Sequence, residues 1–283
     1  MRLDGPDYPA PAKLNLFLHV VGRRADGYHL LQSAFALIDA ADRLRFSVRG
    51  DGEIRRVNDL PGVPAGEDLV VRAAALLKAE TGTGLGADIE VDKRLPLGGG
   101  VGGGSSDAAT TLIVLNRLWR LGLDRPALQG LGARLGADVP FFVFGRNAWV
   151  EGVGEKLTPL EIPRAWYAVL VPPVAILTGE VFAAPELTRH TEALKIEDFS
   201  AHEGSHRFRN DLEAVVAARY PQVREHLEWL ARHGPGGRLT GSGACVFSRF
   251  EDRISAERVL EKLPGTMKGF VAQGLEDHPL RGY

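Results

Sequence analysis

Alternating hydrophobic and polar positions near the start of the chain predict a β-strand. Residues 13–20 read KLNLFLHV, with leucine or valine at every second position. A period of two is the pattern of a half-buried strand, in which successive side chains point to opposite faces. Lys13 and Asn15 should therefore share one face of this strand, together with Phe17 and His19.

The patterns that follow predict further strands, a helix and the turns between them. The sequence GRRADG at residues 22–27 is typical of a turn. Apolar residues alternate again at 44–48 and 88–92, which predicts two more strands. Residues 68–78 place leucine and alanine three and four positions apart, which is the spacing of an amphipathic helix. Pro96 should end the strand that precedes it.

Six glycines occur among the seven residues 98–104, which are here called the glycine loop. Apolar residues recur at helical spacing after it, so a helix should begin at about Ser106 and end before Gly122. The N–H groups of a first helical turn are unpaired and carry a partial positive charge, and glycine lets further N–H groups approach a ligand. Ser105 and Ser106 add hydroxyls that can bind phosphate or magnesium. The pattern therefore indicates a polyphosphate site.

Three other interpretations of the glycine loop are weaker. A flexible linker would not lie between a strand and an apolar-faced helix. Gly98, Gly100 and Gly103 fit the dinucleotide fingerprint, but the window about 20 residues further on reads RLWRLGLD, the end of a helix, where that fingerprint requires an acid at the end of a second strand. The Walker loop is excluded because G-K-[ST] follows no glycine loop in the chain.

Two further polar segments precede apolar runs. In LGADVPFFVFG, Asp138 should lie in a turn before Pro140 and a predicted strand, and an isolated aspartate there is more often a turn residue than a catalyst. Residues 238–250, RLTGSGACVFSRF, predict a second glycine and serine turn at a hairpin or strand entry. Neither segment alone indicates a function.

Composition and charge limit the class of protein. A chain of 283 residues is long enough for two domains, and its composition of 45% hydrophobic and 25% charged residues is typical of a globular protein. A net charge of -2 and a pI near 6.5 argue against nucleic acid as a partner. The single cysteine, Cys245, excludes an intrachain disulfide and a four-cysteine zinc site. The longest apolar run, residues 165–177, is too short for a membrane span, and the N-terminus has no apolar signal core, so we expect a cytoplasmic protein without membrane partners.

Taken together, the segments PAKLNLFLHVVGRRADGYH, LPLGGGVGGGSSDAATTL, LGADVPFF and TGSGACVF resemble the motifs of the GHMP kinase family. The resemblance runs from Pro11 to about Phe250 and includes RNDLE at residues 209–213. It implies an α+β fold of two domains, an N-terminal ribosomal-protein-S5-like one and a C-terminal ferredoxin-like one, with the active site in the cleft between them. We expect the boundary near Glu155, where the chain becomes proline-rich, and hence domains 1–155 and 156–283.

The combination of PAKLNLFLHV, ADGYH and LGADVPFF is similar to one branch of the family, which serves isoprenoid biosynthesis. That branch transfers the γ-phosphate of ATP to a tertiary hydroxyl of a cytidylyl-bearing polyol. A tertiary alcohol is a poor nucleophile, so a carboxylate in reach of its proton helps, and Asp138 matches the family's base. Lys13 matches the lysine that would keep Asp138 ionised and offset charge on the migrating phosphoryl group.

The resemblance also assigns the binding residues and the ligands. ATP is expected as phosphoryl donor, with Mg²⁺ held mainly by its phosphates and Ser106. The expected ATP-binding residues are the glycine loop with its flanks and two residues nearer the far end of the nucleotide: Pro96, Gly98, Gly99, Gly100, Val101, Gly102, Gly103, Gly104, Ser105, Ser106, Lys93 and Asp68. The expected substrate-binding residues are Asn15 for the polyol or diphosphate and Tyr28, His29 and Phe182 for the cytosine, which would stack on an aromatic face.

Two departures from the family pattern and several alternatives remain. Asp68 stands where relatives usually have an adenine-contacting asparagine, and an ionised aspartate cannot donate a hydrogen bond. The segment before Phe182 differs from the threonine- and proline-rich version common in relatives. The alternatives are a homoserine or mevalonate kinase, a diphosphomevalonate decarboxylase, or a catalytically silent nucleotide-binding regulator. We expect small-molecule partners and a monomer or weak dimer.

Overall fold

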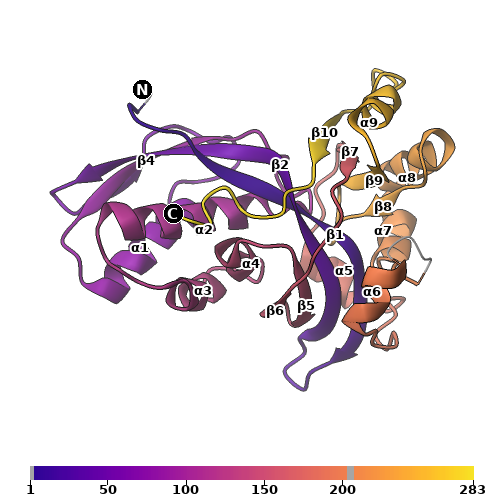
Figure 1. Ribbon diagram of the computed structural model, residues 1–283, viewed down its shortest axis with the longest axis horizontal. Coiled ribbons are helices and arrows are strands. Elements are labelled where there is room, and N and C mark those ends of the chain that lie inside the picture. The colour runs from indigo at the N-terminus through magenta and orange to yellow at the C-terminus, as the bar shows by residue number, and fades with distance from the viewer. Residues whose placement is uncertain (1–2, 203–206) are drawn as a thin grey trace.

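The computed structural model describes residues 3–202 and 207–283 (Figure 1), and within them the strands form two sheets. The first sheet has the order β3-β4-β2-β5-β6, with β1 paired to β2, and the second has the order β10-β7-β9-β8. The strands of the first sheet are β1 (Tyr8–Arg23), β2 (His29–Arg49), β3 (Ile54–Arg56), β4 (Gly86–Asp92), β5 (Ala148–Gly152) and β6 (Lys156–Pro159). Those of the second are β7 (Trp166–Leu170), β8 (Arg238–Leu239), β9 (Val246–Phe250) and β10 (Gly269–Gln273).

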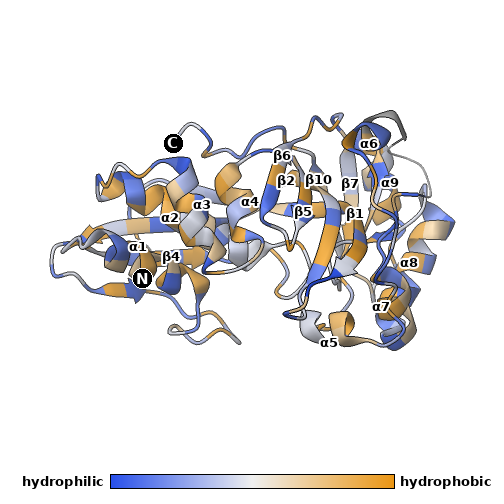
Figure 2. Ribbon diagram, turned by 90° about the horizontal axis from the view of Figure 1, so that it is seen from below, coloured by the Kyte–Doolittle hydropathy of each residue, from blue (hydrophilic) through white to orange (hydrophobic). Residues whose placement is uncertain are grey.

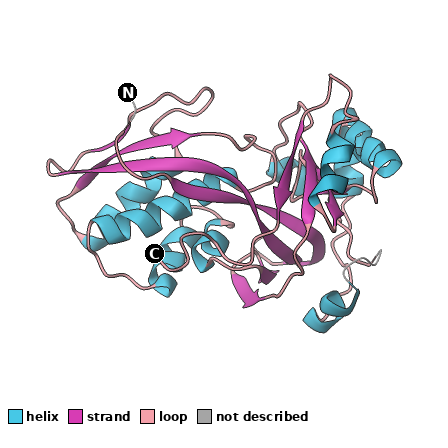
Figure 3. Ribbon diagram, turned by 45° about the horizontal axis from the view of Figure 1, so that its top comes forward, coloured by secondary structure: helices cyan, strands magenta, loops and turns pink. Residues whose placement is uncertain are grey.

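Helices cover each sheet, which gives the mixed helix and strand architecture that the resemblance implied (Figure 3). The helices beside the first sheet are α1 (Leu69–Thr81), α2 (Gly103–Leu118), α3 (Arg125–Ala133) and α4 (Val139–Phe144). The later helices are α5 (Thr178–Ala183), α6 (Ile196–His202), α7 (Glu213–Arg219), α8 (Pro221–His233) and α9 (Arg253–Leu260). Figure 2 shows hydrophobic residues in α2 and in the strands on which it packs, and α2 is buried over most of its length.

Strand β1 exists as predicted, but it is not half-buried. Its two faces are both covered, and Lys13, Phe17 and His19 are as buried as the leucines between them. Leu18 and Val20 belong to the apolar cluster of the second sheet, whereas Phe17 packs in a cluster between the two sheets. The strand therefore runs through the middle of the molecule. Lys13 and Asn15 line the site described below, but the predicted alternation does not continue: the register shifts between Asn15 and Phe17, so Leu18 lines the site whereas Phe17 and His19 do not.

Two predicted elements need correction, one strand and the start of one helix. The run after Asp138 forms helix α4 and not a strand, because a short, fully buried apolar segment shows no period that separates the two structures. Pro140 fits its first turn, and Gly145 ends it with a φ of 73°. Helix α2 begins at Gly103, three residues earlier than predicted, so that Ser105 and Ser106 lie within its first turn.

The two-domain boundary expected near Glu155 stays a prediction. Strand β6 begins at Lys156 and still pairs with β5 of the first sheet. The C-terminal segment after β10 returns to the first sheet (Figure 1), where the Leu275 N–H donates to the Leu37 carbonyl at 2.8 Å. None of the helices in the described part of the chain is long and apolar enough to cross a membrane.

Candidate active site

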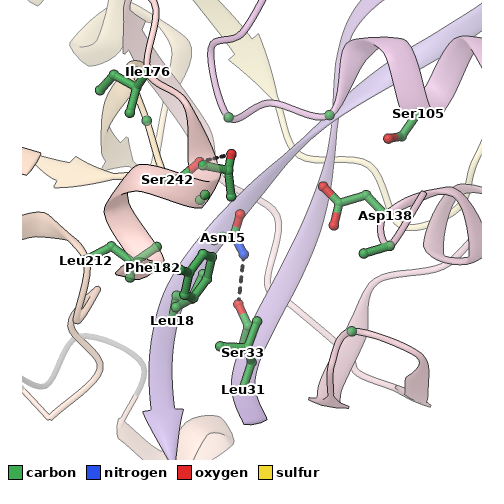
Figure 4. Close-up of a pocket in the computed structure, with 18 of the residues that line it drawn as sticks. Asn15, Leu18, Leu31, Ser33, Ser105, Asp138, Ile176, Phe182, Leu212 and Ser242 are labelled. Atoms are coloured by element: carbon green, nitrogen blue, oxygen red, sulfur yellow. Dashed lines mark hydrogen bonds between the residues drawn. The ribbon is translucent and has the colours of Figure 1, made fainter. Parts of the chain in front are cut away.

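A cavity of about 940 Å³ is lined by strands of the first sheet and by helices and loops, some of which belong to the part of the chain that forms the second sheet. Strand β1, the glycine loop, the first turn of α2 and the start of α4 form one wall. The β1–β2 turn, α5 and the loop between β8 and β9 form the other. Figure 4 shows Asn15, Ser105 and Asp138 reaching this space from three different elements.

Lys13 and Asp138 form an ion pair in the wall of this cavity. The Nζ atom of Lys13 lies 3.3 Å from Oδ2 of Asp138, and the lysine side chain is 3% exposed against 31% for the aspartate. The Lys13 ammonium also lies 4.5 Å from the centre of the Phe35 ring. Asp138 precedes α4 without accepting a capping bond from it. Its carboxylate is therefore free of helix contacts and open to the cavity.

Asn15 connects the two walls. Its side chain donates to Ser33 Oγ at 3.0 Å (Figure 4). The same side chain accepts a 2.5 Å hydrogen bond from Lys13 Nζ, and the Asn15 backbone N–H donates to Thr240 Oγ1 at 3.0 Å. The prediction that Lys13 and Asn15 share a face of the strand is thus confirmed. Thr240 belongs to the loop between β8 and β9, so this network fixes that loop against β1.

Glycine in the glycine loop serves backbone packing as well as ligand approach. Gly98, Gly100 and Gly102 have φ values between 65° and 73°, a region that other residues rarely adopt. A Cβ at Gly100 would lie 2.3 Å from the Thr240 carbonyl oxygen, so glycine permits close contact between the glycine loop and the loop after β8. The Lys13 N–H also donates to the Val101 carbonyl at 2.9 Å.

The first turn of α2 presents its backbone to the cavity. A Cβ at Gly104 would meet only Leu69, at 3.6 Å, and Gly104 and Ser105 line the cavity. Ser106 is fully buried, and its hydroxyl has no hydrogen-bond partner in the described structure. The two serines therefore differ, because only the hydroxyl of Ser105 faces the space where a phosphate would bind.

Lys93 lies between two buried carboxylates beside the glycine loop. Its Nζ donates to Asp42 Oδ2 and to Asp107 Oδ2, each at 2.6 Å, and Asp42 also accepts from the N–H groups of Arg94 and Leu95. Burial raises the pKa of Asp107 to about 7, although the Lys93 ammonium acts in the opposite direction. We call Asp42, Lys93 and Asp107 the buried charge cluster; it joins the segment after β4 to β2 and to α2.

The residues expected to bind a base meet at the far end of the cavity. The rings of His29 and Phe182 are stacked, with centroids 5.0 Å apart and an angle of 29° between their planes. Tyr28 lines the same region and is 66% exposed. Burial, and then the charge of Arg189, lowers the pKa of His29. An exposed aromatic ring beside a stacked pair is suited to hold a planar ligand.

Asp68 does not line the cavity. It caps helix α1 by accepting a 3.0 Å hydrogen bond from the Val70 N–H, and it pairs with Arg56 at 2.6 Å. Both interactions occupy its carboxylate, so the structure gives Asp68 a structural role and leaves its neighbour Leu69 in the cavity wall.

Sequence reasoning missed several residues that build the site. Asn210 of the RNDLE segment donates to the carbonyls of Leu239 and Gly241, at 2.9 and 2.8 Å, and so positions the loop after β8. The resemblance singled out the segment but gave it no role. Asp42 and Arg189 carry no local motif, because their partners are distant in the sequence.

The described residues fit a magnesium ion that is held mainly by a nucleotide. No group of three or more histidine, cysteine, aspartate or glutamate side chains in residues 3–202 and 207–283 is arranged to hold a metal. The hydroxyl of Ser105 is the serine oxygen that lines the cavity at the helix start. Hard oxygen ligands of this kind suit Mg²⁺, which commonly keeps several waters and binds through substrate phosphates.

Two known family models match parts of the chain. The model of the GHMP kinases N terminal domain matches residues 68–146, which contain the glycine loop and Asp138. The model of the GHMP kinases C terminal domain matches residues 187–269, which contain Asn210 and the loop after β8. Fold and site thus define a small-molecule kinase of this class.

Individual relatives show which branch of the GHMP kinases this chain is similar to. A protein of Aromatoleum aromaticum named 4-diphosphocytidyl-2-C-methyl-D-erythritol kinase is 59% identical over 277 residues, which are 98% of this chain and 96% of that protein. A protein of Thiobacillus denitrificans with the same name is 60% identical over 273 residues, 96% of each chain. A crystal structure of 4-(cytidine 5'-diphospho)-2C-methyl-D-erythritol kinase matches with a TM-score of 0.83 at 34% identity and covers 95% of this chain and 99% of that one. The chain belongs to the GHMP kinase family and, within it, to the 4-diphosphocytidyl-2-C-methyl-D-erythritol kinases.

Proposed function

We propose that this protein transfers the γ-phosphate of ATP to the 2-hydroxyl of 4-diphosphocytidyl-2-C-methyl-D-erythritol, giving the 2-phosphate and ADP, as a step of the non-mevalonate route to isoprenoid precursors. The observation that carries the proposal is the Lys13–Asp138 pair, which lies between an open glycine loop and an aromatic base-binding end in one cavity. Phosphate donor and cytidylyl acceptor would then meet at this pair.

Asp138 would take the proton of the attacking hydroxyl. Its carboxylate opens to the cavity without helix contacts, and Lys13 lies 3.3 Å away. The buried ammonium would offset the negative charge that gathers between donor and acceptor oxygens during transfer. Asn15 holds the lysine in place and reaches Ser33 and Thr240, so the reacting groups are positioned before the substrate arrives.

The glycine loop and the first turn of α2 would hold the phosphates of ATP. Gly104 and Ser105 present N–H groups and one hydroxyl to the cavity at the positive end of a 16-residue helix. Bound Mg²⁺ would supply charge neutralisation on the phosphates, and Ser105 is the residue placed to contact it. Since the Ser106 hydroxyl is buried away from the cavity, we assign it no metal contact.

The cytosine would bind beside Tyr28, His29 and Phe182, within reach of the aromatic faces and of the edge of the imidazole. These rings lie at the end of the cavity formed by the β1–β2 turn and α5, whereas the glycine loop lies at the other. The base would thus be recognised at one end of the cavity and the phosphoryl group transferred nearer the other. This arrangement would separate the enzyme from homoserine and mevalonate kinases, whose substrates carry no base to stack.

An assay of coupled ADP release tests the proposal. The purified protein should turn over the cytidylyl substrate with ATP and should release little ADP with homoserine or mevalonate. Phosphorus NMR of the product should show a new phosphomonoester besides the intact diphosphate. ADP release with mevalonate or homoserine alone would refute the substrate assignment, and no release with any acceptor would favour a nucleotide-binding regulator.

Replacing Gly104 by valine should weaken binding of ATP and ADP by about tenfold or more. The new side chain finds open space in the protein, so it fits without a clash and fills part of the cavity beside the first-turn N–H groups. Calorimetric titration of ATP, ADP and the cytidylyl substrate measures the effect, and the cytidylyl affinity should stay within about twofold.

Gly130→Val is a matched control, because a Cβ at this position of α3 meets nothing within 4 Å and Gly130 does not line the cavity. It makes the same change in helix propensity without touching a ligand. Equal nucleotide affinities in the two variants would show that the first turn of α2 does not bind the phosphates and has a structural role alone.

Replacing Tyr28 by alanine should raise the KM for the cytidylyl substrate about 5- to 150-fold, which corresponds to a stacking contribution of roughly 1–3 kcal/mol. Tyr28 is largely exposed, so its removal should leave the fold intact. The KM for ATP should remain nearly constant, since the ring lies far along the cavity from the glycine loop. A variant that loses ATP affinity and keeps its cytidylyl affinity would show that the two ligands bind in the opposite orientation.

A further inference from the structure

Arg189 contacts the base-binding end of the cavity, and all three nitrogens of its guanidinium donate hydrogen bonds to residues there. Its Nη2 atom donates to the carbonyls of Phe182 and Ala184, at 3.0 and 2.6 Å, and its Nη1 donates to the Leu187 carbonyl at 3.0 Å. Its Nε donates to the Nε2 atom of His29 at 3.1 Å. One side chain thereby holds both rings of the stacked pair, one through the backbone of α5 and the other through its imidazole.

The bond to His29 determines where the imidazole carries its proton. Arginine donates through all its nitrogens and accepts through none, so the His29 Nε2 atom must be the acceptor. A neutral imidazole that accepts at Nε2 carries its hydrogen on Nδ1. Burial, followed by the charges of Arg189 and of Arg23 on β1, lowers the pKa of His29, which agrees with a neutral ring.

We propose that Arg189 is a positioning residue that fixes His29 as the Nδ1–H tautomer, so that the base-binding end offers a hydrogen-bond donor and selects cytosine over uracil. The inference rests on the proposed function for its substrate. Cytosine has an unprotonated ring nitrogen, N3, beside its carbonyl oxygen, and both accept hydrogen bonds. Uracil carries a hydrogen on the same ring nitrogen, so that a donor meets a donor there and a buried polar group stays unpaired.

The test compares Arg189→Leu with Arg219→Leu. Arg219 pairs with Glu186 and contacts the Glu180 carbonyl, so it lies against the same helix, α5, without contacting His29. In Arg189→Leu, the KM for the cytidylyl substrate should rise about tenfold, and the preference for this substrate over its uridylyl analogue, measured as the ratio of kcat/KM values, should fall about tenfold. The control should retain both values.

Nitrogen-15 NMR of labelled His29 supplies a readout that a purely structural role would not change. In the wild type, Nδ1 should be protonated and Nε2 unprotonated, whereas Arg189→Leu should show a mixture of tautomers and a pKa nearer 6.5. Wild-type His29 with an unprotonated Nδ1 would overturn the proposal. An equal rise of KM for both analogues with the Nδ1–H tautomer intact would also overturn it, because Arg189 would then only support α5.

Binding measurements separate this inference from the proposed reaction. With the glycine loop saturated by ADP, calorimetry should show that the wild type binds CDP more tightly than UDP, and that Arg189→Leu loses this preference. That result would support the role of Arg189 even in a protein that phosphorylates neither analogue, in which case the proposed function alone would fail. Equal wild-type affinity for CDP and UDP would contradict the inference in a protein that is otherwise an active kinase.

Discussion

Replacing Asp138 by asparagine should lower kcat on the order of 10²-fold or more, while the affinity for ATP stays near that of the wild type. Asparagine keeps the shape of the side chain but cannot take a proton. Because Asp138 accepts no capping bond from α4, the substitution removes no helix contact. It does remove the counter-charge of the buried Lys13, so the variant should be checked for folding before its kinetics are interpreted.

Asp124→Asn is the matched control for this experiment. Asp124 also precedes a helix, where its side chain accepts from the Ala127 N–H at 2.9 Å, and asparagine caps a helix about as well as aspartate. Asp124 does not line the cavity, so kcat should be retained in this variant. A kcat near wild type in Asp138→Asn would remove Asp138 from the mechanism, and a loss of ATP binding would indicate that the variant acts through the structure of the site.

Local sequence signals predicted the elements whose pattern does not depend on distant contacts. Helix α1 has a capping aspartate, an amphipathic face and a C-terminal glycine, and it was found within a few residues of its true ends. Strand β2 is 21 residues long, but only its end near residues 44–48 was predicted, because much of its first half is buried on both faces and does not alternate. Helix α4 was misassigned for the same reason, since complete burial removes the period.

The same difference between local and distant contacts separates the site residues that were predicted from those that were missed. The motif residues Lys13, Asn15 and Asp138 were predicted, and the structure brings them into contact. The residues that orient them were missed, because their roles depend on backbone atoms far away in the sequence. Asn210 reaches the loop after β8, and Arg189 reaches His29 from another part of the chain. Single-sequence patterns carry no information on such pairs, whereas a run of glycines and an aspartate two residues before a proline can be recognised locally.

Replacing Lys93 by methionine should lower the free energy of unfolding by about 3–5 kcal/mol, which is the usual cost of leaving a buried charge without its partner. The side chains of Asp42 and Asp107 are 0% and 6% exposed, so water cannot take the place of the lost ammonium. Urea denaturation at pH 8 measures the effect. A loss below about 1 kcal/mol would show that the buried charge cluster contributes little to stability.

Asp107→Asn measures the contribution of the Asp107 charge apart from that of Asp42, because asparagine still offers Lys93 an oxygen as a hydrogen-bond acceptor. Burial raises the pKa of Asp107 to about 7, from an ordinary value of 3.8. An acid with a raised pKa in the folded state loses its contribution to stability as the pH rises from its unfolded to its folded pKa. The wild type should therefore lose stability relative to Asp107→Asn between about pH 4 and pH 7, and a difference that is independent of pH would contradict the raised pKa.

The same cluster links stability to nucleotide binding. Asp42 accepts from the N–H groups of Arg94 and Leu95 before the glycine loop, and Asp107 lies in α2 after it, so Lys93 joins the two ends of the loop. A loop with loosened ends must be ordered when ATP binds, and that ordering costs free energy. Lys93→Met should therefore also weaken ATP binding by about tenfold, whereas Asp107→Asn should not. Calorimetric titration at a temperature where both variants are folded separates an effect on ATP binding from global unfolding. If the folded Lys93→Met variant binds ATP with wild-type affinity, the cluster contributes to stability alone.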